Sequence, residues 1–396
     1  MPNRRIPSEF TPNEITALLE EKHRAGETIL DLTETNPTKA GLGGAGPAEL
    51  QALADPRGLV YEPCPKGAPV AREAVAKFYE ERARGAGAPK TRGVPRIASD
   101  DLVLVASTSE AYAHLLRLLC EPGQEILVPR PSYPLFEPLA ALEGVRVEHY
   151  RLAYHDRWQL DLDSLEGALS KCTRAVALVQ PNNPTGSCFS AEETEEVVAL
   201  CVNRGIAIIS DEVFGDFPWP PSTSLLPTML GERRALTFVL GGLSKLCGMP
   251  QMKVAWIAVS GPERAKQEAL SGLEWIADLF LSVSTPVQVA LPALLQSRHR
   301  FQAAVRGRLE TNLSRLHALG NGNRGFRVLR GVGGWSAVLE TPPVAGDLAL
   351  EALRKHNVLV HPGHFYDMAQ DDSVVVSLLP EPGIFEKGVA CLTRLT

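Results

Sequence analysis

Two lysines stand eight residues apart in a segment that begins with glycines and is otherwise apolar. Residues 241–256 read GGLSKLCGMPQMKVAW, with Lys245 directly after a turn and Lys253 further on. Burial penalises the charged ammonium, so an apolar setting lowers the pKa of a lysine toward the neutral amine that forms a Schiff base. Lys245 is therefore a candidate for covalent chemistry with an aldehyde. The alternative is a lysine that buries only its stem and keeps its charged end in water.

A second candidate residue comes earlier in the chain. Asp211 closes the apolar run IAIISD, which is typical of a buried strand. A carboxylate in such a place needs a partner to offset its desolvation. Asp211 is thus expected to face a cation, and the alternative is a capping role.

Two polar turns follow other apolar runs. Ser107, Thr108 and Ser109 come after VLVA and begin a helical pattern, where free N–H groups favour a phosphate, although serine and threonine are also common helix caps. The segment VQPNNPTG places Asn182 and Asn183 after a strand, and an ordinary turn is the alternative there.

The elements that must position these residues alternate along the chain. From residue 101, short continuous apolar runs alternate with helical patterns such as residues 190–204, which favours a mostly parallel α/β sheet. After about residue 285 a long helical tract precedes short strands and a final helix. We expect a large domain over 46–285, a smaller α+β domain over 286–396, and an N-terminal segment, 1–45, that packs with the smaller one.

Composition narrows the class of function. The chain has 396 residues, 44% apolar and 22% charged residues and a net charge of −6, so it has no general attraction for nucleic acid. Seven cysteines show no metal-ligand spacing, which favours a reducing cytoplasm. No secretion signal or membrane span is expected. Small molecules or a second subunit are the expected partners.

The order of the motifs resembles the class I/II aminotransferases, which are fold-type-I pyridoxal-phosphate enzymes of the aspartate aminotransferase superfamily. The matching segments are YEPCPKG, STS, PRPSYP, NPTG, DEVF, GLSK and Lys253, and they cover nearly the whole chain. The resemblance implies a mostly parallel central sheet with helices on both faces, plus a smaller α+β domain formed by the N- and C-terminal segments.

The resemblance also implies roles around the cofactor, pyridoxal 5′-phosphate. Lys245 would form the Schiff base and shuttle a proton, and Asp211 would keep the pyridine nitrogen protonated. Asn183 would donate a hydrogen bond to the ring oxygen O3′, and Tyr133 would stack on the ring.

The phosphate and the substrate would be held by further residues. Lys253 replaces the arginine that the family usually has there. Tyr61 would reach the phosphate of a neighbouring subunit, with Thr285 as a second candidate for this contact, so a homodimer with shared sites is implied. Asn36, in the segment LTETNPT, is the expected polar contact to substrate. The remaining phosphate-binding residues implied by the resemblance are Ser107, Thr108, Ser109 and Ser244.

Two positions depart from the family pattern. Phe214 stands where the family has a tyrosine that binds O3′, and Val375 stands where it has the arginine that binds the substrate carboxylate. An apolar residue cannot bind a carboxylate. Arg130, His361 and His364 are candidates for that role by location only.

The leading hypothesis is an aminotransferase that moves an amino group between an amino acid or related amine and a 2-oxo acid. The alternative is a pyridoxal-phosphate lyase, decarboxylase or substitution enzyme on the same fold. A third hypothesis, a regulatory domain that binds the cofactor without chemistry, is disfavoured because no basic DNA-binding module precedes the fold.

Overall fold

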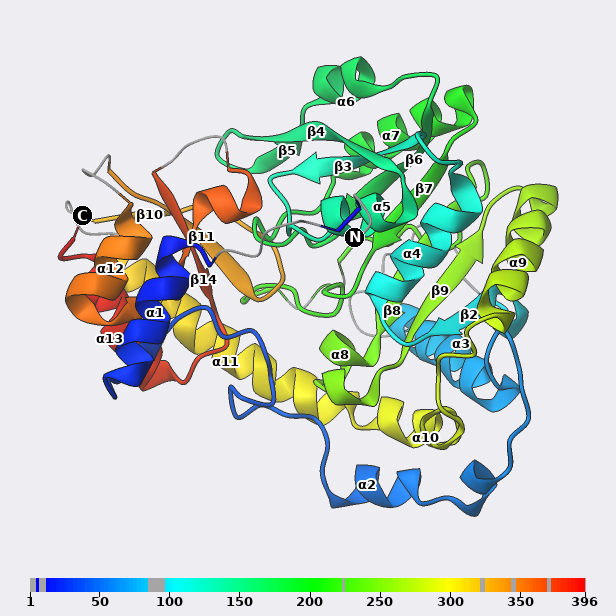
Figure 1. Cartoon of the computed structure of the whole chain (residues 1–396), viewed down its shortest axis with the longest axis horizontal. Coiled ribbons are helices and arrows are strands. Elements are labelled where there is room, and N and C mark those ends of the chain that lie inside the picture. Colours follow the sequence, from blue (N-terminus) through cyan, green and yellow to red (C-terminus); the bar gives the residue numbers. More distant parts are fainter. Residues whose placement is uncertain are drawn as a thin grey trace.

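The structure is a computed structural model of the chain, and it describes residues 5–6, 12–84, 97–222, 224, 226–320, 325–342, 347–368 and 372–395. Two lobes are visible in Figure 1, a larger one around a broad sheet and a smaller one that carries both the first helix and the last.

The larger lobe is built on an eight-stranded sheet. Strands β3, β4, β6, β7 and β8 are joined by parallel pairings, whereas β9 runs antiparallel to both its neighbours and β5 is antiparallel to β4. Most of these strands are buried along their length, as expected for a sheet covered on both faces. The order across the sheet is β2 (Leu102–Val105), β9 (Ala255–Ser260), β8 (Thr237–Gly242), β7 (Ala207–Asp211), β6 (Thr173–Val179), β3 (Glu125–Arg130), β4 (Arg146–Tyr154) and β5 (Trp158–Leu160).

Helices cover both faces of this sheet. Alternate strand residues point to opposite faces, so Val103 and Val105 pack into one core while Leu102 and Leu104 pack into another. The predicted fold class, a mostly parallel α/β sheet between helices, is confirmed. The first core is shared with α4 (Thr108–Leu119), α5 (Phe136–Glu143) and α9 (Glu263–Asp278), and the second with α3 (Pro69–Arg84), α6 (Leu162–Ala168), α7 (Ala191–Arg204) and α10 (Thr285–Gln296).

Local sequence explains where these helices begin and end. Ser190 caps α7 through a reciprocal capping box with Glu193, and Gly205 ends it in the left-handed conformation at φ 64°. Ser107 caps α4 by accepting a hydrogen bond from the Glu110 N–H. The polar start of α4 therefore lies directly beyond the end of β2.

The smaller lobe joins segments from the two ends of the chain. Its four-stranded sheet has the order β10 (Arg327–Val328), β11 (Ser336–Glu340), β14 (Ser373–Ser377) and β13 (His361–Pro362). Near the N-terminus, β1 (Leu30–Asp31) pairs in parallel with β12 (Val358–Leu359). The helices of this lobe are α1 (Glu14–Arg24), α11 (Arg298–Gly320), α12 (Leu348–His356) and α13 (Pro382–Leu392).

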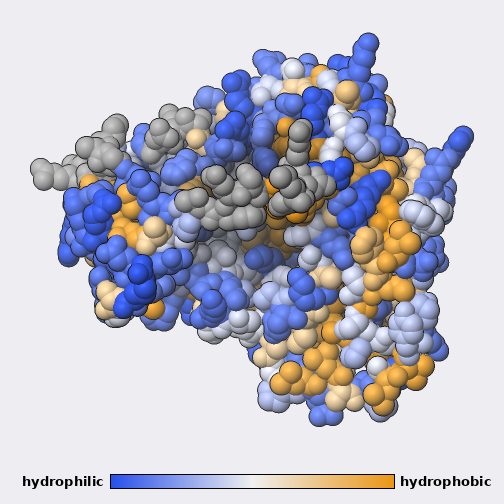
Figure 2. All heavy atoms as spheres, viewed as in Figure 1, coloured by the Kyte–Doolittle hydropathy of each residue, from blue (hydrophilic) through white to orange (hydrophobic). Residues whose placement is uncertain are grey.

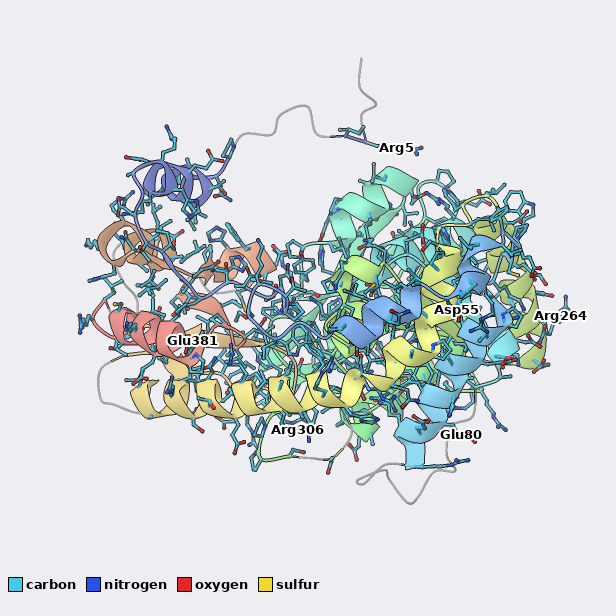
Figure 3. The ribbon with its side chains drawn as sticks, turned by 90° about the horizontal axis from the view of Figure 1, so that it is seen from below. Arg5, Asp55, Glu80, Arg264, Arg306 and Glu381 are labelled. Atoms are coloured by element: carbon cyan, nitrogen blue, oxygen red, sulfur yellow. The ribbon has the colours of Figure 1, made fainter. Side chains whose placement is uncertain are left out.

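Helix α11 links the two lobes. The helical tract expected after residue 285 is divided, because α10 ends at Gln296 and α11 begins at Arg298. Figure 3 shows α11 running along the molecule with Arg306 part-way along it, Glu381 in the smaller lobe and Arg264 at the opposite end. Within the described part of the chain, none of the helices is both long and apolar enough to cross a membrane.

Candidate active site

Three neighbouring strands bring the candidate residues to one edge of the large sheet. β6, β7 and β8 are parallel neighbours, with Val179 paired to Asp211 and Asp211 to Leu240. β6 runs into the turn that holds Asn183, and β8 runs into the short helix α8 (Leu243–Leu246), which holds Lys245. Because parallel strands end at the same edge, residues more than 60 positions apart in the sequence meet there.

The amine of Lys245 lies in an apolar setting. Burial lowers its pKa, and the nearby charge of Asp211 acts in the opposite direction. Its Nζ is 5.5 Å from the centre of the Phe214 ring and 5.2 Å from that of Trp335. Both rings are buried and pack edge to face. The amine is thus poised to lose its proton and react with a carbonyl group.

Asp211 is partly buried, and its carboxylate accepts two hydrogen bonds, both of them long. Its Oδ1 accepts from the Val213 N–H at 3.2 Å, and its Oδ2 accepts from the Tyr112 hydroxyl at 3.3 Å. Burial raises the pKa of Asp211 to about 6, against the lowering effects of these donors and of Lys245. A cation placed beside it would regain the lost charge stabilisation.

The turn after β6 places an unpaired polar atom beside this edge. The Asn183 Oδ1 is buried without a hydrogen-bond partner among the described residues. Gly186, at φ 66°, closes the turn and donates its N–H to the Asn182 carbonyl at 2.8 Å. The Gly186 carbonyl then accepts the N–H groups of Val332 and Gly333. These bonds hold the segment that leads to Trp335 against the site.

Three of the phosphate-binding candidates lie at the start of α4, and a fourth, Ser244, lies on α8. Ser107, Thr108 and Ser109 are half-buried, as is Ser244. The Glu110 carboxylate is already engaged, because its Oε2 accepts from the Ala106 N–H and from the Ser282 hydroxyl, both at 2.6 Å. The first N–H groups of α4 and their dipole favour an anion at this point.

Lys253 is less enclosed than the residues at the start of α4. It ends the short helical turn η3 (Pro250–Met252), is exposed, and has a left-handed backbone at φ 52°. An exposed lysine ammonium is a flexible point charge rather than a fixed ligand.

Two tyrosines expected at the cofactor are exposed in the single chain. Tyr133 follows the end of β3 and is half exposed, while the preceding Ser132 donates its N–H to the Tyr366 carbonyl at 3.1 Å. Tyr61 is 70% exposed and lines a surface depression together with Thr285. The structure therefore places Tyr61 beside Thr285 on the surface.

The substrate loop is tied to the smaller lobe. Asn36 forms a tight turn, because its Oδ1 accepts from both the N–H and the hydroxyl of Thr38 and its own N–H donates to the Glu34 carboxylate. The Glu34 carbonyl accepts from the Ser377 hydroxyl at 2.6 Å. The side-chain oxygen of Asn36 is thus occupied by its own turn.

Val375 is buried in the middle of β14, and its cross-strand neighbours are His361 and Val338. It belongs to the core shared with the large sheet, whereas Val374 and Val376 face the core of the smaller lobe. The position that the resemblance assigns to a carboxylate anchor is therefore an apolar wall.

Each of the three residues considered as a binding group for the substrate carboxylate makes another contact in the structure. Arg130 donates to the Asp367 carboxylate at 3.0 Å, which offsets its charge. His361 Nδ1 shares a hydrogen bond with the Tyr366 hydroxyl at 2.8 Å, and burial lowers the pKa of the histidine. His364 is exposed and packs against Phe365.

Two residues at the site had no role in the sequence-based prediction. Tyr112 lies within the apolar stripe of α4, and Trp335 directly precedes β11 of the smaller lobe. Neither stretch carries a local signal of chemistry, since both read as core. An aromatic residue directly after the glycines of GVGGW was the one available indication for Trp335.

Comparison with known proteins agrees with this geometry. Residues 28–377 match the family described as aminotransferase class I and II, so the chain belongs to that family and the predicted resemblance is confirmed. Over 240 residues, 59% of this chain, it is 32% identical to nicotianamine aminotransferase 1 of Oryza sativa subsp. japonica. Over 346 residues, 83% of this chain and 81% of the relative, it is 24% identical to the glutamate-pyruvate aminotransferase AlaA of Haemophilus influenzae.

The extent of these matches differs. The chain spans about half the length of the nicotianamine aminotransferases that it matches, at 46%, 44% and 48%. Among solved structures, the alanine aminotransferase from Pyrococcus furiosus superposes with a TM-score of 0.87, covering 100% of this chain and 99% of that one, at 22% identity. At that identity the superposition establishes the fold alone.

Proposed function

We propose that the protein is a pyridoxal-phosphate-dependent aminotransferase that transfers an amino group between an amino acid or related amine and a 2-oxo acid. The observation that carries this proposal is the enclosed amine of Lys245, which faces the Asp211 carboxylate between the rings of Phe214 and Trp335. Membership of the aminotransferase class I and II family supports it.

The residues present fit pyridoxal 5′-phosphate. Asp211 is a partly buried carboxylate whose raised pKa leaves room for a cation beside it, and the start of α4 favours a phosphate. The side chain of Asn183 lies at the same sheet edge, and its amide N–H groups are the donors that the ring oxygen O3′ would need. When bound, the cofactor supplies an aldehyde that accepts the amino group and a ring that withdraws electrons.

Each residue then has a role that follows from its chemistry. Lys245 would hold the aldehyde group of the cofactor through its amine and would move the proton at the substrate carbon. Asp211 holds the proton on the ring nitrogen. Tyr133 and Asn183 orient the ring, and Tyr61 of a second subunit reaches the phosphate. The phosphate itself is held by Ser107, Thr108, Ser109, Ser244 and Lys253, Phe214 lines the O3′ side, and Asn36 shapes the substrate loop through its turn.

A single-turnover experiment tests this proposal. Protein loaded with pyridoxal 5′-phosphate is mixed with one amino donor at a time, without an oxo acid, and the products are separated chemically. An aminotransferase converts the bound aldehyde to pyridoxamine 5′-phosphate in stoichiometric amount. Regeneration of the aldehyde with loss of carbon dioxide, ammonia or a leaving group would instead identify a lyase, decarboxylase or substitution enzyme.

The donor panel must include amines without an α-carboxylate. Val375 offers no charge, and the adjacent His361 is hydrogen-bonded to Tyr366 with its pKa lowered. Alanine, glutamate and aromatic amino acids are therefore compared with the amines of the same side chains. The ratio of their single-turnover rates measures how much the carboxylate contributes to recognition.

We further propose that the enzyme is a homodimer. Leu59 is 88% exposed and Trp275 is 68% exposed, and Figure 2 shows hydrophobic surface around α2 (Pro47–Leu53) and beside α9. Exposed apolar surface of this kind is typical of a protein interface. The depression that joins Tyr61 to Thr285 lies in the same region. Sedimentation of Tyr61→Asp and wild-type protein tests the proposal, which predicts a weakened dimer.

A cytoplasmic location is proposed from the cysteines. All seven are free thiols, and none forms a disulfide. A reducing compartment maintains that state.

A further inference from the structure

The hydroxyl of Tyr112 approaches Asp211 from a different element. Tyr112 lies on α4, is 2% exposed, and donates to the Asp211 Oδ2 at 3.3 Å. This is the one hydrogen bond that the structure describes for its hydroxyl. Its ring is held edge to face against Phe136, with centroids 5.2 Å apart. A buried hydroxyl aimed at a partly buried carboxylate is a built contact, since without it the Tyr112 hydroxyl and the Asp211 Oδ2 would each lack a hydrogen-bond partner among the described residues.

The two donors to Asp211 divide its oxygens between them. The Val213 N–H binds Oδ1 at 3.2 Å and the Tyr112 hydroxyl binds Oδ2. One donor on each oxygen fixes the plane of the carboxylate, because rotation about the Cβ–Cγ bond would break both. Each carboxylate oxygen can accept a second hydrogen bond. The N–H of the cofactor ring would donate to one of these oxygens.

We propose that Tyr112 is a positioning residue that orients the Asp211 carboxylate and favours its ionised form for pairing with the ring nitrogen of the cofactor. This inference rests on the proposed function. The titratable groups that face Asp211 are Tyr112 from α4, Glu212 beside it in the chain and Lys245 from α8. Of these, Tyr112 and Lys245 favour the charged carboxylate, whereas Glu212 opposes it.

The test measures binding of pyridoxamine 5′-phosphate between pH 5 and pH 8. This probe cannot form a Schiff base with Lys245, so its affinity isolates the contacts to the ring and the phosphate. The proton equilibria of the probe are common to all variants and cancel in the comparison. Tyr112→Phe removes only the hydroxyl and keeps the contact with Phe136.

The matched control is Tyr150→Phe. Tyr150 is equally buried, and its hydroxyl donates to the Ala177 carbonyl at 2.8 Å, on another part of the same sheet. Asp211→Asn reports the profile without a titrating carboxylate. Melting temperatures of the apo proteins show whether each variant folds.

In the wild type, affinity for the probe should fall as the pH is lowered and Asp211 takes up a proton. In Tyr112→Phe this fall should occur about one pH unit higher, because a hydrogen bond to a charged group, at the lower end of its range of strength, corresponds to about one pKa unit. Tyr150→Phe should follow the wild type, and Asp211→Asn should lose this step. Should Tyr112→Phe not fold, 3-fluorotyrosine introduced at position 112, a stronger donor, should shift the step downward.

Two results would overturn the inference and separate it from the proposed function. If Asp211→Asn loses the step while Tyr112→Phe and Tyr150→Phe both match the wild type, Tyr112 has no positioning role and the cofactor site stands. If all four proteins give the same profile, Asp211 does not face the probe, and the proposed cofactor site fails together with the role of Tyr112.

Discussion

The end of β7 presents two consecutive carboxylates to two different regions of the molecule. Asp211 faces the candidate site, with two long hydrogen bonds and the amine of Lys245 nearby. Glu212 faces the core beneath α3, where it accepts hydrogen bonds from the Ser210 and Thr228 hydroxyls and the Met229 N–H.

The two regions differ in how far their charges are satisfied. The buried Arg82 guanidinium lies 3.9 Å from Glu212 and 3.4 Å from Asp216, so the core region contains its own counter-charge. Burial raises the pKa of both carboxyls, and that of Asp211, which has two long hydrogen bonds and, among the described residues, no arginine beside it, rises to about 6. A buried group with its partners present is structural, whereas a buried group that lacks one is prepared for a ligand.

The largest expected effect is on Lys245. Lys245→Ala should abolish turnover, because no other amine is held in the apolar setting between Phe214 and Trp335 among the described residues. Borohydride reduction of the wild-type holoenzyme followed by peptide mapping should find the cofactor on Lys245. Finding it on Lys253 would place the chemistry outside the region that we assign to the site.

Asp211→Asn should separate activity from stability. Turnover should fall at least about a hundredfold, because the charge that stabilises the ring is lost. The folded pKa of about 6 lies above the ordinary aspartate value of 3.8, so the stability that Asp211 contributes is full below about pH 4 and is lost as the pH rises through 6. The apo variant should therefore be more stable than the wild type at pH 8, by up to about 3 kcal/mol.

Urea titrations of both apo proteins at pH 4.5 and pH 8 check this sign. The advantage of the variant should shrink at the lower pH. A variant that is less stable than the wild type at pH 8 would mean that Asp211 is already fully paired in the apo protein, and the contrast with Glu212 would disappear.

Part of this organisation follows from the sequence, and part depends on the three-dimensional arrangement. Continuous apolar runs that end in polar residues are enough to predict a parallel sheet with Asp211 and Lys245 at one edge. The hydrogen bond from Tyr112 depends on how α4 lies across β7, over a separation of 99 residues. A tyrosine in an apolar helical stripe reads as core, because periodicity reports the buried face and not the partner of a hydroxyl.

The smaller lobe and the Glu212 network also contain contacts that sequence periodicity could not predict. The position of Val375 opposite His361 depends on the pairing of short strands. The network of Glu212 likewise draws on Arg82 from α3, about 130 residues away. Long-range pairs of this kind leave no local pattern in the sequence.

Glu212→Ala should affect stability and leave the cofactor region intact. Removing one partner of a buried ion pair costs about 3–5 kcal/mol, because Arg82 would keep its charge with fewer partners. Glu268→Ala is the control, since Glu268 pairs with Arg264 on the exposed face of α9 and should change the free energy of unfolding by less than about 0.5 kcal/mol. Urea denaturation of the apo proteins measures both.

Folded Glu212→Ala should still bind pyridoxamine 5′-phosphate within a few-fold of the wild type. A large loss of affinity in folded protein would show that the core region and the site act as one unit. A free energy of unfolding equal to that of the wild type would show that the buried pair is not structural.

The smallest effect is expected at Lys253, which is exposed, whereas Asp211 is partly buried and Glu212 is buried. An exposed charge is screened by salt and contributes about 0.2–1 kcal/mol, so Lys253→Ala should weaken pyridoxamine 5′-phosphate binding by about 1.4- to 5-fold at low ionic strength. Lys253→Arg should retain or improve the affinity, because the guanidinium fork suits a phosphate. Raising the salt concentration should reduce the difference between the alanine variant and the wild type.

Lys77→Ala, which removes an exposed lysine from α3, is the matched control and should leave the affinity unchanged. Equal affinity in the Lys253 and Lys77 alanine variants at low salt would place Lys253 away from the phosphate, and a loss of a hundredfold would mean that Lys253 becomes enclosed when the site is occupied.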